Sequence, residues 1–312
     1  MSVYTVRSLC RLSALCVLVS ACGDGDINAT DSETGSEASS ASNSESDTHH
    51  GGSDSGGAGY CDQVDLLFVI DESPTMANEQ DTLTSAFPEF IATIDQELAQ
   101  KRGVSYRVGV LSADMTIGRV EDSSRGRLRH MPDRLPCTDT PSKHWIEPGP
   151  IPTISAQFQC IASMESFGFI ETPLEALRAG LVDRVEDTEA YNAGFLRPDA
   201  VLFVMFVTDE DDQSSLMWDG MQQAPPTPVQ TYWDLLLQLK GGDPDKLVLT
   251  ALSGPASTGC SMPGSAEMAP RVHELLALAP HSLWGSLCAD EYSTQLGQAL
   301  DLIDATCQLH PD

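Results

Sequence analysis

One short stretch, residues 65–76 (DLLFVIDESPTM), constrains what this chain can fold into more than any other. Its first part, residues 66–70, is a continuous apolar run without alternation, which is typical of a strand buried on both faces of a parallel sheet. Asp71, Ser73 and Thr75 follow at alternate positions, and a helical pattern begins after them. Oxygen groups at the carboxyl end of a buried strand predict a ligand site at that edge of an α/β sheet, suited to Mg²⁺, Mn²⁺ or Ca²⁺.

Strand and helix patterns alternate along the rest of the chain. Expected strands lie at residues 66–70, 104–113, 201–207, 247–252 and 282–284. Expected helices lie at residues 79–100, from 173 onward, at 229–239, 266–278 and 291–306. This alternation predicts a doubly wound α/β fold with a mainly parallel central sheet flanked by helices. Residues 115–160 lack periodicity, and we expect an irregular insertion of loops and short strands there.

The overall charge excludes one class of partner. The chain has 312 residues, of which 41% are hydrophobic, so it can build a core, but its formal net charge is −29. A surface this acidic repels phosphate backbones, and we therefore expect no nucleic-acid partner.

The N-terminal 21 residues are typical of a secretory signal. Arg7 and Arg11 precede an apolar run at residues 12–20, which is too short to span a bilayer. The run ends in Val-Ser-Ala-Cys22, which resembles the lipobox of bacterial lipoproteins. The resemblance implies cleavage before Cys22, a lipid anchor on this residue and a place in the cell envelope. Gly23, rather than Asp, follows the cysteine and favours the outer over the inner membrane. The alternative is an ordinary signal peptide with an incidental cysteine.

A polar tether follows the expected anchor. Residues 23–60 contain eight acidic residues, no Lys or Arg and almost no large apolar side chains. Such a segment cannot bury enough apolar surface to fold, so we expect a disordered linker that spans roughly 30–40 Å. The composition changes at Cys61, and residues 61–312 are expected to form the globular domain.

Nine cysteines constrain the domain further. Cys10 and Cys16 leave with the signal and Cys22 takes the lipid, which leaves six. An even number in an exported chain predicts three disulfides, with fifteen possible connectivities. The order of the elements favours three pairs, which would join the domain's two ends, close the insertion and clamp the last crossover. These pairs are Cys61–Cys307, Cys137–Cys160 and Cys260–Cys288.

Two further features fit the first motif. Asp209 follows the apolar strand at 201–207, and residues 168–181 (GFIETPLEALRAGL) open a helix between the two strands. With Asp71-x-Ser73-x-Thr75, they resemble the von Willebrand factor type A family over about residues 61–307. The family places Asp-x-Ser-x-Ser after the first strand, a Thr at the start of a middle helix and an Asp after the fourth strand. Here Thr75 replaces the last Ser of that motif and keeps its hydroxyl.

The resemblance implies a metal-ion-dependent adhesion site. Its ligands would be Asp71, Ser73, Thr75 and Asp209 around a divalent cation, foremost Mg²⁺. The middle ligand stays open between two residues: the helix register selects Glu171, whereas residue type selects Thr172. A Glu at this position could bind the metal directly or close its sixth coordination position.

The function implied is non-catalytic binding of a protein partner, which donates an oxygen, typically a carboxylate, to the cation. One alternative is a degenerate site in which Asp71 and Asp209 only cap helices. The other is a Mg²⁺-dependent phosphatase of the haloacid dehalogenase type, whose nucleophile motif is Asp-x-Asp-x-Thr. Ser73 stands where that mechanism needs a second carboxylate as general acid, which argues against an enzyme.

Overall fold

The computed structural model describes residues 61–115, 125–131, 137, 139–164, 170–186, 188–215, 225–261 and 265–309. The predicted signal peptide, the predicted lipidation site Cys22 and the predicted linker lie outside these residues. Among the helices of the described residues, none is both long and apolar enough to cross a membrane.

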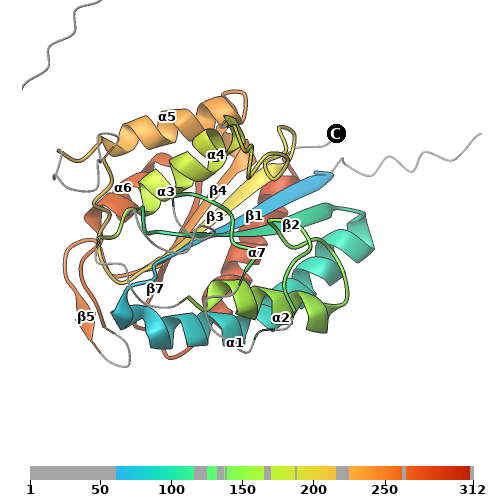
Figure 1. Cartoon of the computed structure of the whole chain (residues 1–312), viewed down its shortest axis with the longest axis horizontal. Helices are drawn as coiled ribbons and strands as arrows, with labels where there is room; N and C mark the ends of the chain where they lie inside the picture. Colours follow the sequence, from blue (N-terminus) through green and yellow to red (C-terminus); the bar gives the residue numbers. More distant parts are fainter. Residues whose placement is uncertain are drawn as a thin grey trace, which may run out of the picture. The chain divides into compact units, whose positions relative to one another are not determined.

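Five parallel strands form the central sheet in the order β2-β1-β3-β4-β7 (Figure 1). These are β1 (Gln63–Ile70), β2 (Ser105–Ser112), β3 (Val201–Thr208), β4 (Leu247–Ser253) and β7 (His281–Ser286). The chain leaves β1 for β2 on one side, and it then returns to build β3, β4 and β7 on the other side. The topological switch point therefore lies between β1 and β3, and the predicted doubly wound parallel sheet is confirmed.

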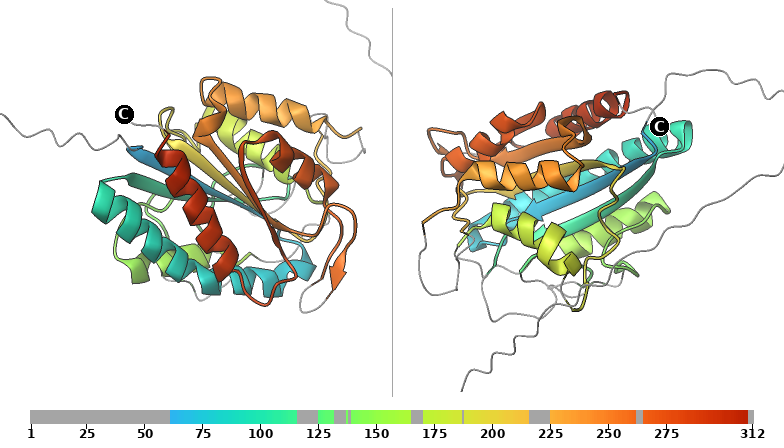
Figure 2. Two further views of the ribbon diagram at one scale, coloured as in Figure 1. Left: turned by 180° about the vertical axis from the view of Figure 1, so that it is seen from behind. Right: turned by 90° about the horizontal axis from the view of Figure 1, so that it is seen from above.

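Helices cover both faces of this sheet (Figures 1 and 2). One face carries α1 (Ala77–Ile94), α2 (Ile151–Ala162) and α7 (Ser293–Cys307). The other carries α3 (Pro173–Arg178), α5 (Val229–Leu239) and α6 (Pro270–Leu278), and the short helix α4 (Arg184–Glu186) follows α3. Along β1, Phe68 packs into the core under α1, α2 and α7, whereas Leu67 and Val69 pack into the core under α3, α5 and α6. Cover on both faces explains the uninterrupted apolar run at residues 66–70 of this strand.

Two predictions of secondary structure are wrong: one missed a helix, and the other placed the start of a helix too early. The predicted irregular insertion at 115–160 contains the start of α2, whose Ile154, Phe158 and Ile161 are buried at helical spacing behind a first-turn proline. The helix expected at 266–278 begins only at Pro270, because residues 265–266 form strand β6 and pair with β5 (Cys260–Ser261). A proline is well suited to a first helical turn, and this marks both starts.

The structure forms three disulfides with the connectivity that the sequence favours. They are Cys61–Cys307, Cys137–Cys160 and Cys260–Cys288. The first joins the start of β1 to the end of α7, where the Cys61 backbone N–H also donates to the Cys307 carbonyl. It therefore ties the two ends of the domain together.

Candidate metal site

The loop after β1 is held from three sides. The Asp71 N–H continues the sheet by donating to the Val207 carbonyl of β3 at 2.9 Å. The Asp71 carboxylate oxygen Oδ1 accepts the Ser73 N–H at 2.6 Å, which tightens the turn before α1. From the first turn of α1, the Gln80 amide donates to the Asp71 carbonyl at 2.9 Å. This network fixes the Asp71 carboxylate at the carboxyl end of the sheet, where it is fully buried.

The structure brings the other predicted oxygens to the same place. The Ser73 hydroxyl lies 2.9 Å from the Thr75 hydroxyl and 3.4 Å from Oδ1 of Asp209. The Thr208 hydroxyl, at the end of β3, donates to Oδ2 of Asp71 at 3.1 Å. Because β1 and β3 are neighbours across the switch point, residues 136 positions apart in sequence line one site.

The two candidates for the middle position point to different groups. The Thr172 hydroxyl and N–H both donate to the Ala113 carbonyl, at 2.9 and 3.1 Å. The Glu171 carboxylate instead faces that of Asp71, and only 1% of its surface is exposed. Two carboxylates can hydrogen-bond only by sharing a proton, and neither Glu171 oxygen receives a hydrogen bond from another group in the described residues. Of the two candidates, Glu171 is thus the one whose side chain reaches the Asp71 carboxyl group.

Burial and mutual repulsion make these carboxylates reluctant to ionise without a cation. Burial, and then the Asp209 charge, raise the pKa of Asp71. Burial, and then the Asp71 charge, raise the pKa of Glu171. A bound divalent cation would reverse both effects, because it supplies the positive charge that the pocket lacks.

Two glutamates at this edge were missed by the sequence reasoning. Glu79 on α1 is buried, its Oε2 has no partner within the described residues, and burial followed by Asp209 raises its pKa. It stands four residues after Thr75, one helical turn on, and this spacing could have indicated it. Glu72 is also buried, and burial followed by the Asp114 charge raises its pKa to about 8.

The acidic residues that follow Asp209 are only partly exposed to solvent. Asp212 is buried and structural, because Oδ1 accepts the Leu174 N–H at the start of α3 and Oδ2 accepts Nε of Arg271 at 3.0 Å. Asp211 accepts the Arg271 N–H at 2.9 Å. Glu210 is half-buried, and its pKa is raised by burial and then by Asp209.

The donor set fits a hard cation. Within the described part of the chain, no three His, Cys, Asp or Glu side chains form a ready-made cage for a metal. The group here is of another kind, because two hydroxyls, from Ser73 and Thr75, stand between the carboxylates of Asp71 and Asp209. Oxygen donors of this type, with the unpaired Glu171 carboxylate beside them, suit Mg²⁺, Mn²⁺ or Ca²⁺ rather than a softer metal.

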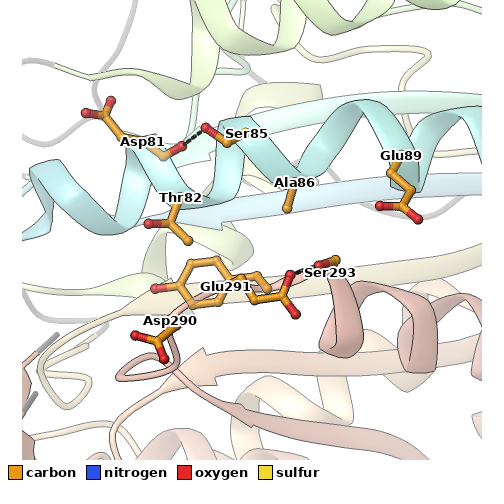
Figure 3. Close-up of a pocket in the computed structure, with 9 residues that line it drawn as sticks. Asp81, Thr82, Ser85, Ala86, Glu89, Asp290, Glu291 and Ser293 are labelled. Carbon is orange, nitrogen blue, oxygen red and sulfur yellow. Dashed lines mark hydrogen bonds between the residues drawn. The ribbon is translucent and has the colours of Figure 1, made fainter. Parts of the chain in front are cut away.

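A second acidic feature differs from this site in its solvation. A pocket of about 390 Å³ lies between α1 and the start of α7, with Asp81 and Glu89 on one wall and Asp290 and Glu291 on the other (Figure 3). Asp81, Glu89 and Glu291 are exposed, and within the described residues no lining side chain is a buried polar group without a partner. Water solvates these carboxylates, so they need no cation.

Comparison with known proteins gives only structural similarities. No protein-family profile matches the sequence, and no curated protein is similar to it. Three solved structures illustrate the similarities: the pilus adhesin SpaC of Lactobacillus rhamnosus GG, a von Willebrand factor type A protein of Catenulispora acidiphila, and proximal thread matrix protein 1 of the mussel byssus with a zinc-occupied MIDAS motif.

The sequence identities to these three are 13%, 13% and 16%, and the TM-scores are 0.44, 0.38 and 0.41. The matches cover 78%, 79% and 78% of this chain but only 31%, 42% and 49% of those chains. The chain thus spans about half or less of the length of the structures it matches. It is similar to proteins of the von Willebrand factor type A fold, and at this identity the similarity says nothing about function.

Proposed function

We propose that this protein is a non-catalytic, cation-dependent protein-binding module, tethered to the cell envelope by a lipid on Cys22. The observation that carries the proposal is the geometry at the switch point. The Ser73 hydroxyl meets both Thr75 and Asp209, and the buried Asp71 carboxylate lies beside it. Asp71, Ser73, Thr75 and Asp209 would hold the cation, and it would supply an electrophilic centre for an oxygen of the partner.

The charge of the site supports a cation as its ligand. The Asp71 carboxyl group is repelled by Asp209 and faces Glu171, whose own oxygens receive no hydrogen bond within the described residues. By contrast, two other buried aspartates, Asp65 and Asp212, are paired with Arg197 and Arg271. An excess of buried negative charge at the carboxyl edge of a parallel sheet is typical of a functional site.

In this proposal, the linker at residues 23–60 positions the binding domain away from the membrane surface. The acidic linker at residues 23–60 is long enough to hold the domain clear of a membrane surface, because a flexible chain of this length spans roughly 30–40 Å. The expected partner is a protein that offers a carboxylate from a neutral or basic surface, since a broadly acidic partner would be repelled by a chain of net charge −29.

A capture experiment tests the proposal. The immobilised mature chain is incubated with envelope extract in Mg²⁺ or in EDTA, as wild type, Asp71→Asn and Asp81→Asn. Asp81 is a matched control, because it is an exposed carboxylate on α1 and its replacement changes the net charge equally. We expect a partner that is retained in Mg²⁺, released by EDTA, absent from Asp71→Asn and present with Asp81→Asn.

Two outcomes would contradict the proposal. Capture that is indifferent to EDTA and to Asp71→Asn would remove the cation from the mechanism. Hydrolysis of p-nitrophenyl phosphate in Mg²⁺ that Asp71→Asn abolishes would instead establish a phosphatase.

A further inference from the structure

The Glu171 carboxylate stands out among the buried groups of the domain. Its side chain is 1% exposed, neither oxygen receives a hydrogen bond within the described residues, and it faces Asp71. Leaving a buried carboxyl group without a hydrogen-bond partner destabilises the fold, and more so if the group ionises, whereas a ligand at this place would supply the missing interaction.

The backbone around Glu171 is held on both sides, so the carboxylate is aimed by the fold. Glu171 forms an isolated antiparallel bridge with Asp114 after β2. Its carbonyl accepts the Gln213 N–H at 2.8 Å, from the segment after β3. The next residue, Thr172, is fixed by two hydrogen bonds to the Ala113 carbonyl. The start of α3 therefore presents a carboxylate to the site, whereas the neighbouring hydroxyl is engaged elsewhere.

We propose that Glu171 is an internal ligand that closes the cation site, taking the coordination position that a partner's carboxylate would otherwise fill. The inference rests on the proposed function, because it assumes a cation held by Asp71, Ser73 and Asp209. With a divalent cation bound, the Asp71 and Asp209 carboxylates give a net charge of zero, and the Glu171 carboxylate makes it about −1. The cation is then held more tightly, and an external carboxylate must displace Glu171 before it can bind.

Mn²⁺ is a suitable probe, because it replaces Mg²⁺ at oxygen sites and reports how many water molecules it carries. The full mature chain is titrated with Mn²⁺ alone as wild type, Glu171→Ala and Glu171→Gln. Free Mn²⁺ is measured by electron paramagnetic resonance, and metal-bound water by proton relaxation. Thr172→Val is the matched control, since it alters the other candidate at the same helix start.

We expect Glu171→Ala to weaken Mn²⁺ binding roughly tenfold or more and to add at least one water to the bound ion. Glu171→Gln keeps an oxygen of the same shape, so it should weaken binding by a similar factor without the extra water. Thr172→Val should leave both quantities unchanged. Glu171→Gln also guards against misfolding, because it preserves the volume of the side chain.

Three results separate the possible failures. If Mn²⁺ binds, Asp71→Asn abolishes binding and Glu171→Ala changes neither affinity nor water count, the internal ligand is refuted and the cation site stands. If Thr172→Val adds the water instead, Thr172 is the middle ligand and Glu171 is not. If wild type binds no Mn²⁺, the proposed function itself fails, and the inference with it.

Discussion

Replacing Asp71 by Asn should reverse the effect of Mg²⁺ on stability. In wild type without Mg²⁺, the buried Asp71 carboxylate is disfavoured by desolvation and by Asp209. Asn has the same shape and can still accept the Ser73 N–H, but it carries no charge. We therefore expect Asp71→Asn to be more stable than wild type in EDTA at pH 8, and less stable than wild type in saturating Mg²⁺.

The two magnitudes follow from linkage. A ligand present at one hundred times its Kd stabilises the folded state by about 2.7 kcal/mol. For a domain of this size, each kcal/mol shifts the Tm by about 2–4 °C, so Mg²⁺ should raise the Tm of wild type by about 5–11 °C. In EDTA, Asn removes the desolvation and the Asp209 repulsion that disfavour the ionised carboxylate, so the variant gains stability.

The assay is thermal unfolding followed by circular dichroism, in EDTA and in Mg²⁺, with Asp81→Asn as the control of equal charge change. Asp81 is exposed on α1, so its replacement should leave the response to Mg²⁺ intact. Two results would refute the reasoning: a wild-type Tm that ignores Mg²⁺, or an Asp71→Asn variant that is less stable than wild type in both buffers.

Three more predictions follow from the same structure. Without Mg²⁺, the pKa of Glu72 is raised from 4.5 to about 8, so its stabilising contribution is present below pH 4.5 and is lost towards pH 8. The Tm in EDTA should therefore fall between pH 4.5 and pH 8, and a Tm that does not change over this range would contradict the prediction. Asp65→Asn leaves the Arg197 charge without its partner and should cost about 3–5 kcal/mol in urea unfolding while Mn²⁺ binding persists. Removing Cys61–Cys307, which spans 246 residues, should cost about 5.5 kcal/mol, against about 3.6 kcal/mol for Cys260–Cys288, which spans 28. Equal losses in calorimetry would contradict the chain-entropy account.

The central strands of the sheet could be predicted because β1, β3 and β4 are buried almost throughout and are apolar at most positions. The edge strand β7 is partly exposed and gives a weaker signal. The missed α2 shows the limit of that reasoning: its buried positions, Ile154, Phe158 and Ile161, are three residues in a segment otherwise rich in polar groups and proline. A helix with only one narrow apolar face is recognised once the sheet on which that face packs is known, and not from its sequence alone.

The site could be predicted as a set of residue types but not as an arrangement. Spacing alone places Asp71, Ser73 and Thr75 on one loop, and strand ends place Asp209 beside them. The choice between Glu171 and Thr172 depends on a hydrogen bond to the Ala113 carbonyl, which local sequence does not encode. Glu79 could have been indicated by its spacing of one helical turn from Thr75, but its burial and its proximity to the Asp209 charge depend on the tertiary structure.

The two ends of β1 give a comparison within one strand. Asp65 and Asp71 are both fully buried, six residues apart. At the amino end, the Asp65 carboxylate accepts the N–H and Nε of Arg197, each at 2.7 Å, while Lys240 donates to the Arg197 carbonyl. At the carboxyl end, Asp71 faces two more carboxylates instead of a cation. A chain that pairs one buried aspartate with Arg197 does not lack the means to pair another, so the missing cationic partner at Asp71 supports the proposed cation site.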